Sequence, residues 1–242
     1  MTRLEIVTAA LALVNEPTGD YITAAFLNAR YNEAKRRIER RTLCYPVTST
    51  FTLTASVAAF ILPAGLFALR QSKGVYITGF GFPTFRAWDD LVGEFPLTWN
   101  TTEATYPNFF YLTPAAVTTS GVTNWGIGFY PLASATITDG VTLYGHGISA
   151  DAAADGTPPP WPTPHHMTLV WELCVMAATM DMDYQMRNAR TVAYFKAELK
   201  QAEDELRAAS DEFSAMGGTL QIGGGAPGQP EEGVLMNVNV TL

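Results

Sequence analysis

Side chains that could carry out acid–base or metal chemistry are few in this sequence, and their spacing does not favour a site. There are three histidines. His165 and His166 are adjacent, so on a helix they point in different directions, and the next carboxylate, Glu172, lies nearly two turns further on. His146 lies at the end of a predicted strand over residues 141–147. Capping or a polar contact explains these histidines better than a metal site does, so we predict no metal ligand.

Paired carboxylates are the other candidates for chemistry. Asp89 and Asp90 interrupt a strand-rich region, and Asp181 and Asp183 lie at a predicted turn between helices. Such pairs could bind a cation or act as acid and base, and a hydrolase that uses Asp89 or Asp90 is one alternative. Turn-forming preference explains both pairs more simply. The sequence contains no Gly-x-Ser-x-Gly elbow and no phosphate-binding loop. We therefore predict no catalytic residue, no cofactor and no enzyme.

Composition and charge further narrow the class of protein to which this sequence can belong. The chain has 242 residues, of which 48% are hydrophobic, and a net charge of −8. Such a chain can bury a core, and its acidity argues against a surface that grips nucleic acid. Cys44 and Cys174 are far apart and outside any metal-ligand spacing, which favours reduced core thiols. No stretch of 18 apolar residues exists, so we predict no membrane span. Glu5 and the helical spacing of the first apolar residues argue against a signal peptide.

The order of elements is helix, then strand, then helix. Thr2 and Glu5 form a capping box for a helix that ends near residue 14. A second helix ends near Leu43, and its apolar face consists of Leu27, Tyr31, Ala34 and Ile38. Residues 46–150 contain short alternating strands, with Asp139-Gly140 as a turn signal and possible helix over 85–92. Prolines make 151–162 an extended linker, with Trp161 in a core or in a subunit contact. Two more helices follow, from Thr163-Pro164 to residue 180 and over about 184–215.

Two oppositely charged helix faces could meet. Arg36, Arg37, Arg40 and Arg41 follow helical spacing in the second helix, and an acidic set lies in the last helix: Glu198, Glu203, Asp204 and Glu205. One interpretation is a solvated basic face. Another is a contact between the two faces, in the same or a neighbouring subunit. Nucleic-acid binding is a third and weaker interpretation, because only Tyr31 is interleaved with the basic residues.

The C-terminal tail covers residues 217–242, and its first part, 217–233, is rich in glycine, proline and glutamine and should be flexible by itself. It ends in an alternating, β-prone peptide whose apolar positions are Val234, Met236, Val238, Val240 and the terminal Leu242. A solvated tail rarely ends in this way. We therefore predict that the peptide docks by adding a strand to a sheet edge of another subunit.

Several segments follow one another along the chain in a recognisable order: Tyr31-Asn32-Glu33-Ala34, Arg40-Arg41-Thr42-Leu43-Cys44, Ser49-Thr50-Phe51-Thr52-Leu53-Thr54-Ala55, Phe60-Ile61-Leu62-Pro63-Ala64, Tyr106-Pro107-Asn108-Phe109-Phe110-Tyr111-Leu112, Ile127 to Pro131, Pro159 to Pro164, Asp181 to Asp183 and Arg190 to Tyr194. Their ordered combination, over roughly residues 2–213, resembles the head–tail adaptor (connector) proteins of short-tailed phages, of the tail tubular protein A type.

The resemblance implies an α+β fold in which helices from both chain ends form an antiparallel bundle, with an inserted antiparallel β-domain and an extended C-terminal tail. We expect the bundle at 1–45 and 163–216, the β-domain at 46–150, the linker at 151–162 and the extended tail at 217–242. It also implies a structural virion protein of the tail or neck, assembled in the host cytoplasm as a homo-oligomeric ring of usually twelve copies between the portal and a downstream tail or nozzle protein. Genome DNA would pass through the ring channel without specific binding. Another tail or receptor-binding virion protein, and a host-encoded binding module, remain alternatives.

Overall fold

The computed structural model describes residues 1–14, 22–63, 65–70, 73–95, 98, 101–117, 123–180, 189–213 and 219–221. The helices are α1 (Arg3–Leu13), α2 (Ala24–Thr42), α3 (Trp88–Glu94), η1 (Thr163–His165), α4 (Met167–Thr179) and α6 (Ala189–Phe213). The strands are β1 (Pro46–Leu53), β2 (Ala59–Ile61), β3 (Leu66–Arg70), β4 (Val75–Ile77), β5 (Thr84–Phe85), β6 (Glu103–Ala104), β7 (Phe109–Val117), β8 (Thr123–Tyr130), β9 (Leu132–Ala133), β10 (Ile137–Gly147) and β11 (Thr219–Gln221). The predicted mixed α+β class is confirmed.

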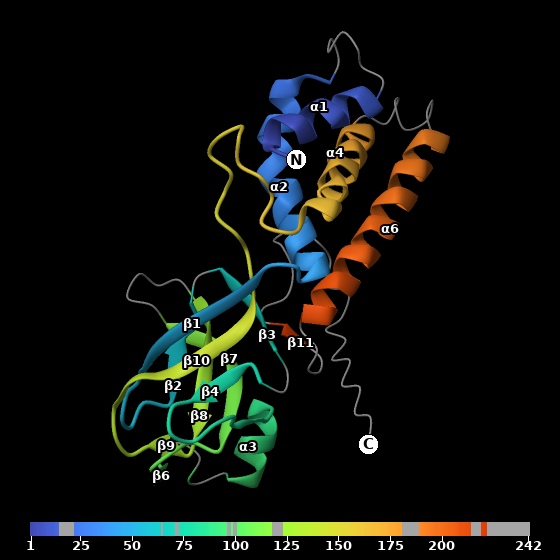
Figure 1. The fold of residues 1–242 in the computed structure, drawn as a ribbon. Coiled ribbons are helices and arrows are strands. Elements are labelled where there is room, and N and C mark those ends of the chain that lie inside the picture. Colours follow the sequence, from blue (N-terminus) through green and yellow to red (C-terminus); the bar gives the residue numbers. More distant parts are fainter. Residues whose placement is uncertain are drawn as a thin grey trace.

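Helices α1, α2, α4 and α6 gather at one end of the molecule, and the sheets with α3 occupy the other (Figure 1). The capping box of α1 forms as predicted, because Thr2 accepts from the Glu5 amide and Glu5 accepts from the Thr2 amide. The predicted stripe of α2 is fully buried. It packs in the same core as Ile6 and Val7 of α1.

Helix α4 lies in contact with α1, α2 and α6. It is buried on most of its circumference, which matches the prediction of a buried helix after Pro164. The sequence placed the helix start at Thr163, whereas Thr163–His165 forms a 3-10 turn and α4 begins at Met167. Trp161 is 4% exposed and lies in this helical core, so its place is within the chain itself. The antiparallel bundle arrangement and the domain boundaries stay predictions.

Two sheets pack around a second core in the strand-rich region. One sheet has the order β1-β10-β3-β11, with β4 also paired to β10, and the other has the order β2-β8-β7-β5. Their shared core includes Leu53, Ile77, Ile127, Phe129 and Val141. The prediction of a purely antiparallel region is wrong in detail, because β5–β7 and β6–β9 are parallel pairs. One strand of each pair, β5 or β6, is two residues long and lies between β4 and β7. No hairpin connects it to its partner strand.

The predicted turn at Asp139-Gly140 is wrong, because both residues lie inside β10. Asp139 has a φ of 49°, in the left-handed region that Asp tolerates better than most residues. The β1–β10 register shifts at this point, so the Asp-Gly pair forms an irregularity within one long strand. The residue types that favour a hairpin turn also favour a bulge, and pairing of β10 with β1 and β4 decides between them.

Tyr111 lies across Gly128 in the second sheet. A methyl group at Gly128 would overlap the Tyr111 ring, so only glycine allows this approach. The Tyr111 hydroxyl donates to the Ala58 carbonyl oxygen at 3.2 Å.

The chain beyond α6 returns to the sheets. Residues 219–221 form β11, which pairs with β3 and becomes the edge of the first sheet, although 217–233 was predicted to be flexible by itself (Figure 1). The predicted docking positions Val234, Met236, Val238, Val240 and Leu242 lie outside the described residues.

Candidate functional site

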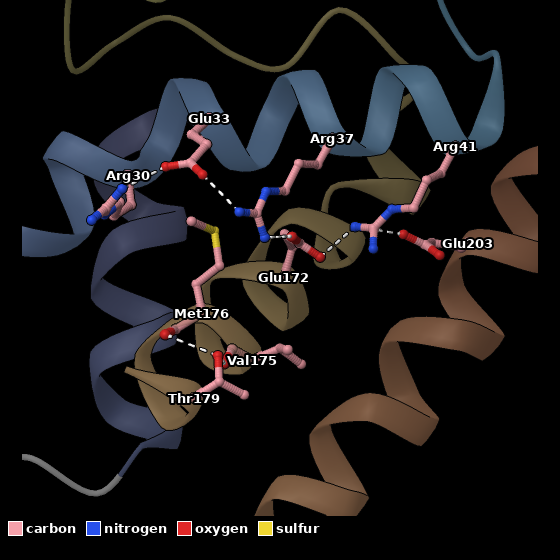
Figure 2. A network of polar contacts seen from close by, with 9 residues as sticks. All are labelled: Arg30, Glu33, Arg37, Arg41, Glu172, Val175, Met176, Thr179 and Glu203. Atoms are coloured by element: carbon pink, nitrogen blue, oxygen red, sulfur yellow. Dashed lines mark hydrogen bonds and ion pairs between the residues drawn. The ribbon is translucent and has the colours of Figure 1, made fainter. Parts of the chain in front are cut away.

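The basic residues of α2 meet a buried carboxylate on α4. Arg41 Nη2 lies 2.5 Å from Glu172 Oε2, and Arg37 Nη1 lies 3.6 Å from Glu172 Oε1. The Glu172 side chain is 2% exposed, so both arginines replace the water that its charge has lost. Figure 2 shows the two guanidinium groups converging on Glu172 from successive turns of α2. The i, i+4 spacing of Arg37 and Arg41 makes this shared contact possible.

Arg41 also reaches the last helix. Its Nη2 atom lies 3.0 Å from Glu203 Oε1 on α6, so one guanidinium joins α2, α4 and α6 (Figure 2). Burial raises the pKa of Glu203 above the ordinary glutamate value, Arg41 lowers it, and the nearby Glu172 charge raises it. The Arg41–Glu203 contact brings one residue of the predicted basic face to one residue of the predicted acidic face within a single chain.

Helix α6 also contacts the carbonyl groups at the C-terminal end of α2. Arg207 Nη2 donates to the Arg41 carbonyl oxygen at 2.6 Å, and Ser210 Oγ donates to the Leu43 carbonyl oxygen at 2.9 Å. The last carbonyls of a helix have no partner within the helix, and the negative end of its dipole favours a cation. These contacts fix the end of α2 immediately before β1 begins.

The return from the sheets to the helices is held by the same helix. Glu39 accepts from the Ser149 amide at 3.2 Å and from the Ser149 hydroxyl, while Lys35 Nζ donates to the Ala150 carbonyl oxygen. Arg36 pairs with Asp151 at 2.9 Å. The chain is therefore held by α6 where it leaves α2 for β1, and by α2 where it returns from β10.

Sequence reasoning missed Lys35 and Glu39, which are 2% and 0% exposed. Burial raises the pKa of Glu39, and burial lowers the pKa of Lys35. A signal was present, because both residues flank Ala34 and Ile38 of the apolar stripe and therefore face the core side of α2.

The remaining charged candidates lie apart from this network. Arg40 is exposed and has no ion pair within the described ranges of the chain. Asp204 is exposed. Glu198 and Glu205 line a hollow of about 120 Å³ between α4 and α6, together with His165, Met167, Trp171 and Gln201. Whether the basic and acidic faces contact neighbouring chains stays a prediction.

The residues first considered for catalysis do not form a cluster in the described structure. Asp89 and Asp90 are exposed in the first turn of α3, and Asp181 and Asp183 lie outside the described residues. His166 is buried, with Nε2 2.9 Å from the Trp161 carbonyl oxygen, and burial lowers its pKa. Within the described part of the chain, no group of three or more His, Cys, Asp or Glu side chains could hold a metal ion. None of the helices described is long and apolar enough to span a membrane.

An exposed aromatic turn, which the sequence did not reveal, lies after β4. Phe80 and Phe82 are 43% and 46% exposed, although each has a ring partner: Phe80 stacks on Tyr106 and Phe82 meets Tyr76 edge-on. The turn closes through hydrogen bonds between the main-chain atoms of Ile77 and Gly81. Large exposed rings held in a fixed turn are typical of a contact surface.

Comparison with known proteins identifies the family. No curated protein matches the chain. A sequence model described as SU10 adaptor protein matches residues 1–221, which includes all the helices and strands described above. Adaptors are structural phage proteins of the virion that associate with other virion components, and the expected resemblance to phage head–tail adaptors is confirmed. Because the match covers more than half of the sequence, the chain belongs to the SU10 adaptor protein family.

Proposed function

We propose that this adaptor forms a homo-oligomeric ring of twelve copies between the portal and the tail of the virion. The ring surrounds the channel through which DNA leaves. The observation that carries the proposal is the match to the adaptor family over residues 1–221. The protein would act in the neck of the particle after assembly in the host cytoplasm.

Contacts within the ring are assigned to the helical region. The proposed intersubunit faces are Arg36, Arg37, Arg40 and Arg41 on α2 and Glu198, Glu203, Asp204 and Glu205 on α6. The outer part of both faces is available, since Arg40 and Asp204 are exposed. The C-terminal peptide with Val234, Met236, Val238, Val240 and Leu242 would add a strand to the portal or to an adjacent subunit.

The sheets would reach the downstream tail or nozzle protein. The exposed Phe80 and Phe82 offer an apolar contact surface at the end of β4. The contacts of α6 and α2 with the two connecting segments support this role, because a movable β-region could not hold a tail component in register. The net charge of −8 supports passage of DNA without binding, since phosphates are repelled by an acidic surface.

The test is electron microscopy of the full chain, alone and mixed with the portal ring of the same phage. We expect a closed ring that binds the portal. The mass of this ring gives the copy number. A trimer, which is typical of receptor-binding tail proteins, would contradict the ring. A particle map that places the chain away from the portal–tail junction would contradict the location.

The tail proposal has its own test. Truncation after Gln221 removes the β-prone peptide but keeps β11 on the edge of β3. We expect the truncated chain to keep its fold, measured by circular dichroism, and to lose portal binding, measured by sedimentation with portal rings. Portal binding as tight as that of the full chain would show that the peptide does not dock there.

A further inference from the structure

The hollow between α4 and α6 has a distinct chemical pattern. Glu198, Gln201 and Glu205 follow one stripe of α6, and Met167 and Trp171 of α4 line the same hollow. Gln201 Nε2 donates to Glu205 Oε1 at 3.0 Å, which orients that carboxylate. The two glutamates lie seven residues apart on the helix, or about 10 Å along its axis. The accessible surface of the hollow is therefore mainly polar, with a carboxylate near each end and the side chains of Met167 and Trp171 at one wall.

Such a hollow suits a long side chain with an apolar stem and a cationic head. The stem can lie against Met167 and Trp171 while the head reaches a carboxylate, as arginine and lysine side chains do at interfaces. The indole of Trp171 adds an attraction for a cation over its ring. The volume of about 120 Å³ fits a side chain and is too small for a helix or strand of a partner.

Arg190, Lys196 and Lys200 are exposed cations of α6, the helix that itself lines the hollow, so a cation from a different surface of the helical region comes from α2. Arg37 and Arg41 are engaged by Glu172, Arg36 by Asp151, and Arg30 by Glu33. Arg40 lies on the exposed side of α2 and is left without an ion pair in the part of the chain that the structure describes. A basic residue on α2 and an acidic hollow between α4 and α6 are complementary surfaces at different places on one molecule.

We propose that Arg40 of one copy inserts into the hollow lined by Glu198, Trp171 and Glu205 of the next copy. The contact joins two different surfaces, so it is heterologous, and its repetition builds a closed ring or a filament. It rests on the proposed ring function and assigns its copy-to-copy contact. Of the predicted acidic face, Glu198 and Glu205 receive the neighbour, while Glu203 is used within the chain by Arg41.

The experiment is a charge-swap series in the full-length chain, with ring formation measured by native mass spectrometry, alone and with portal rings. We expect two variants to lose rings: Arg40→Glu, and the double variant Glu198→Lys with Glu205→Lys. Each variant should weaken the affinity of one copy-to-copy contact by at least about tenfold, and a ring contains this weakened contact many times. The swapped combination of all three changes is expected to restore rings. The matched controls are Arg30→Glu on α2 and Asp90→Lys on α3, which make the same changes of charge at exposed positions outside the hollow and the proposed faces, and should leave assembly unchanged.

The outcomes separate this assignment from the proposed function. If wild type forms rings and both swapped variants still form them, the hollow is not the contact. The same conclusion follows if the combined variant fails to recover ring formation. Failure of wild type to form a ring, alone or on the portal, would instead overturn the ring function. Circular dichroism of every variant confirms that a loss of assembly is not a loss of fold.

Discussion

Replacing Arg41 by methionine should lower the free energy of unfolding by about 2–3 kcal/mol. The substitution keeps an unbranched apolar stem and removes the guanidinium that contacts Glu172 and Glu203. A charge-assisted hydrogen bond contributes about 1.5–3 kcal/mol, and breaking a fully buried pair costs about 3–5 kcal/mol. We expect a loss of unfolding free energy near the lower end of these two ranges. The reasons are that Arg41 is 42% exposed and that Arg37 remains 3.6 Å from Glu172.

The assay is urea unfolding followed by tryptophan fluorescence, since Trp171 is adjacent to Glu172 on α4. With a slope of about 2–3 kcal/mol per molar urea, the midpoint should fall by about 1 M. Dilute protein is used so that assembly does not add to stability. The control is Arg30→Met, which removes an exposed pair with Glu33 on the same helix and should cost at most about 0.5 kcal/mol.

A double variant tests the cause. Arg41→Met combined with Glu172→Leu removes both charges, so it should be less destabilised than the sum of the two single variants by at least about 1.5 kcal/mol. Two results would refute the reasoning: an Arg41→Met variant as stable as the Arg30→Met control, or a double variant whose cost equals the sum of the single costs.

Three further predictions concern buried groups. Tyr31 has no hydrogen-bond partner for its hydroxyl among the described residues, so Tyr31→Phe should leave the free energy of unfolding unchanged or raise it, whereas Tyr111→Phe should lower it by about 1 kcal/mol in the same urea assay. The pKa of Glu39 is raised in the folded state, so the stability that this residue contributes is present below the ordinary pKa of 4.5 and is lost as pH rises through the folded pKa. Glu39→Gln should therefore flatten this part of the profile of unfolding free energy against pH. An unchanged slope would contradict the assignment. Burial raises the pKa of both Cys44 and Cys174 to about 12, so a thiol reagent at neutral pH should label neither in the folded protein and both in urea, and rapid labelling without urea would show that the packing is wrong.

Much of the local structure could be predicted because it depends on neighbours in the sequence. The capping box at Thr2, the buried stripe of α2 and the buried helix before Met180 follow from residue types three and four positions apart. The strand around Phe51 follows from alternation, and the strands around Phe110 and Val141 follow from their aromatic and β-branched residues. The Asp139-Gly140 error has the same origin, because a local pattern does not reveal whether a strand continues beyond it.

The sequence by itself determined the α+β class, the order of helices and strands and the resemblance to adaptors, since these depend on composition, period and the succession of segments. Only the tertiary structure decided which charges meet. Arg41 and Glu172 are 131 residues apart, and their contact exists because α4 packs against α2. The same packing uses Glu203 within the chain, leaves Arg40 exposed and forms the hollow beside Glu198 and Glu205. Charge can be counted in a sequence, but its partner depends on which elements the fold places side by side.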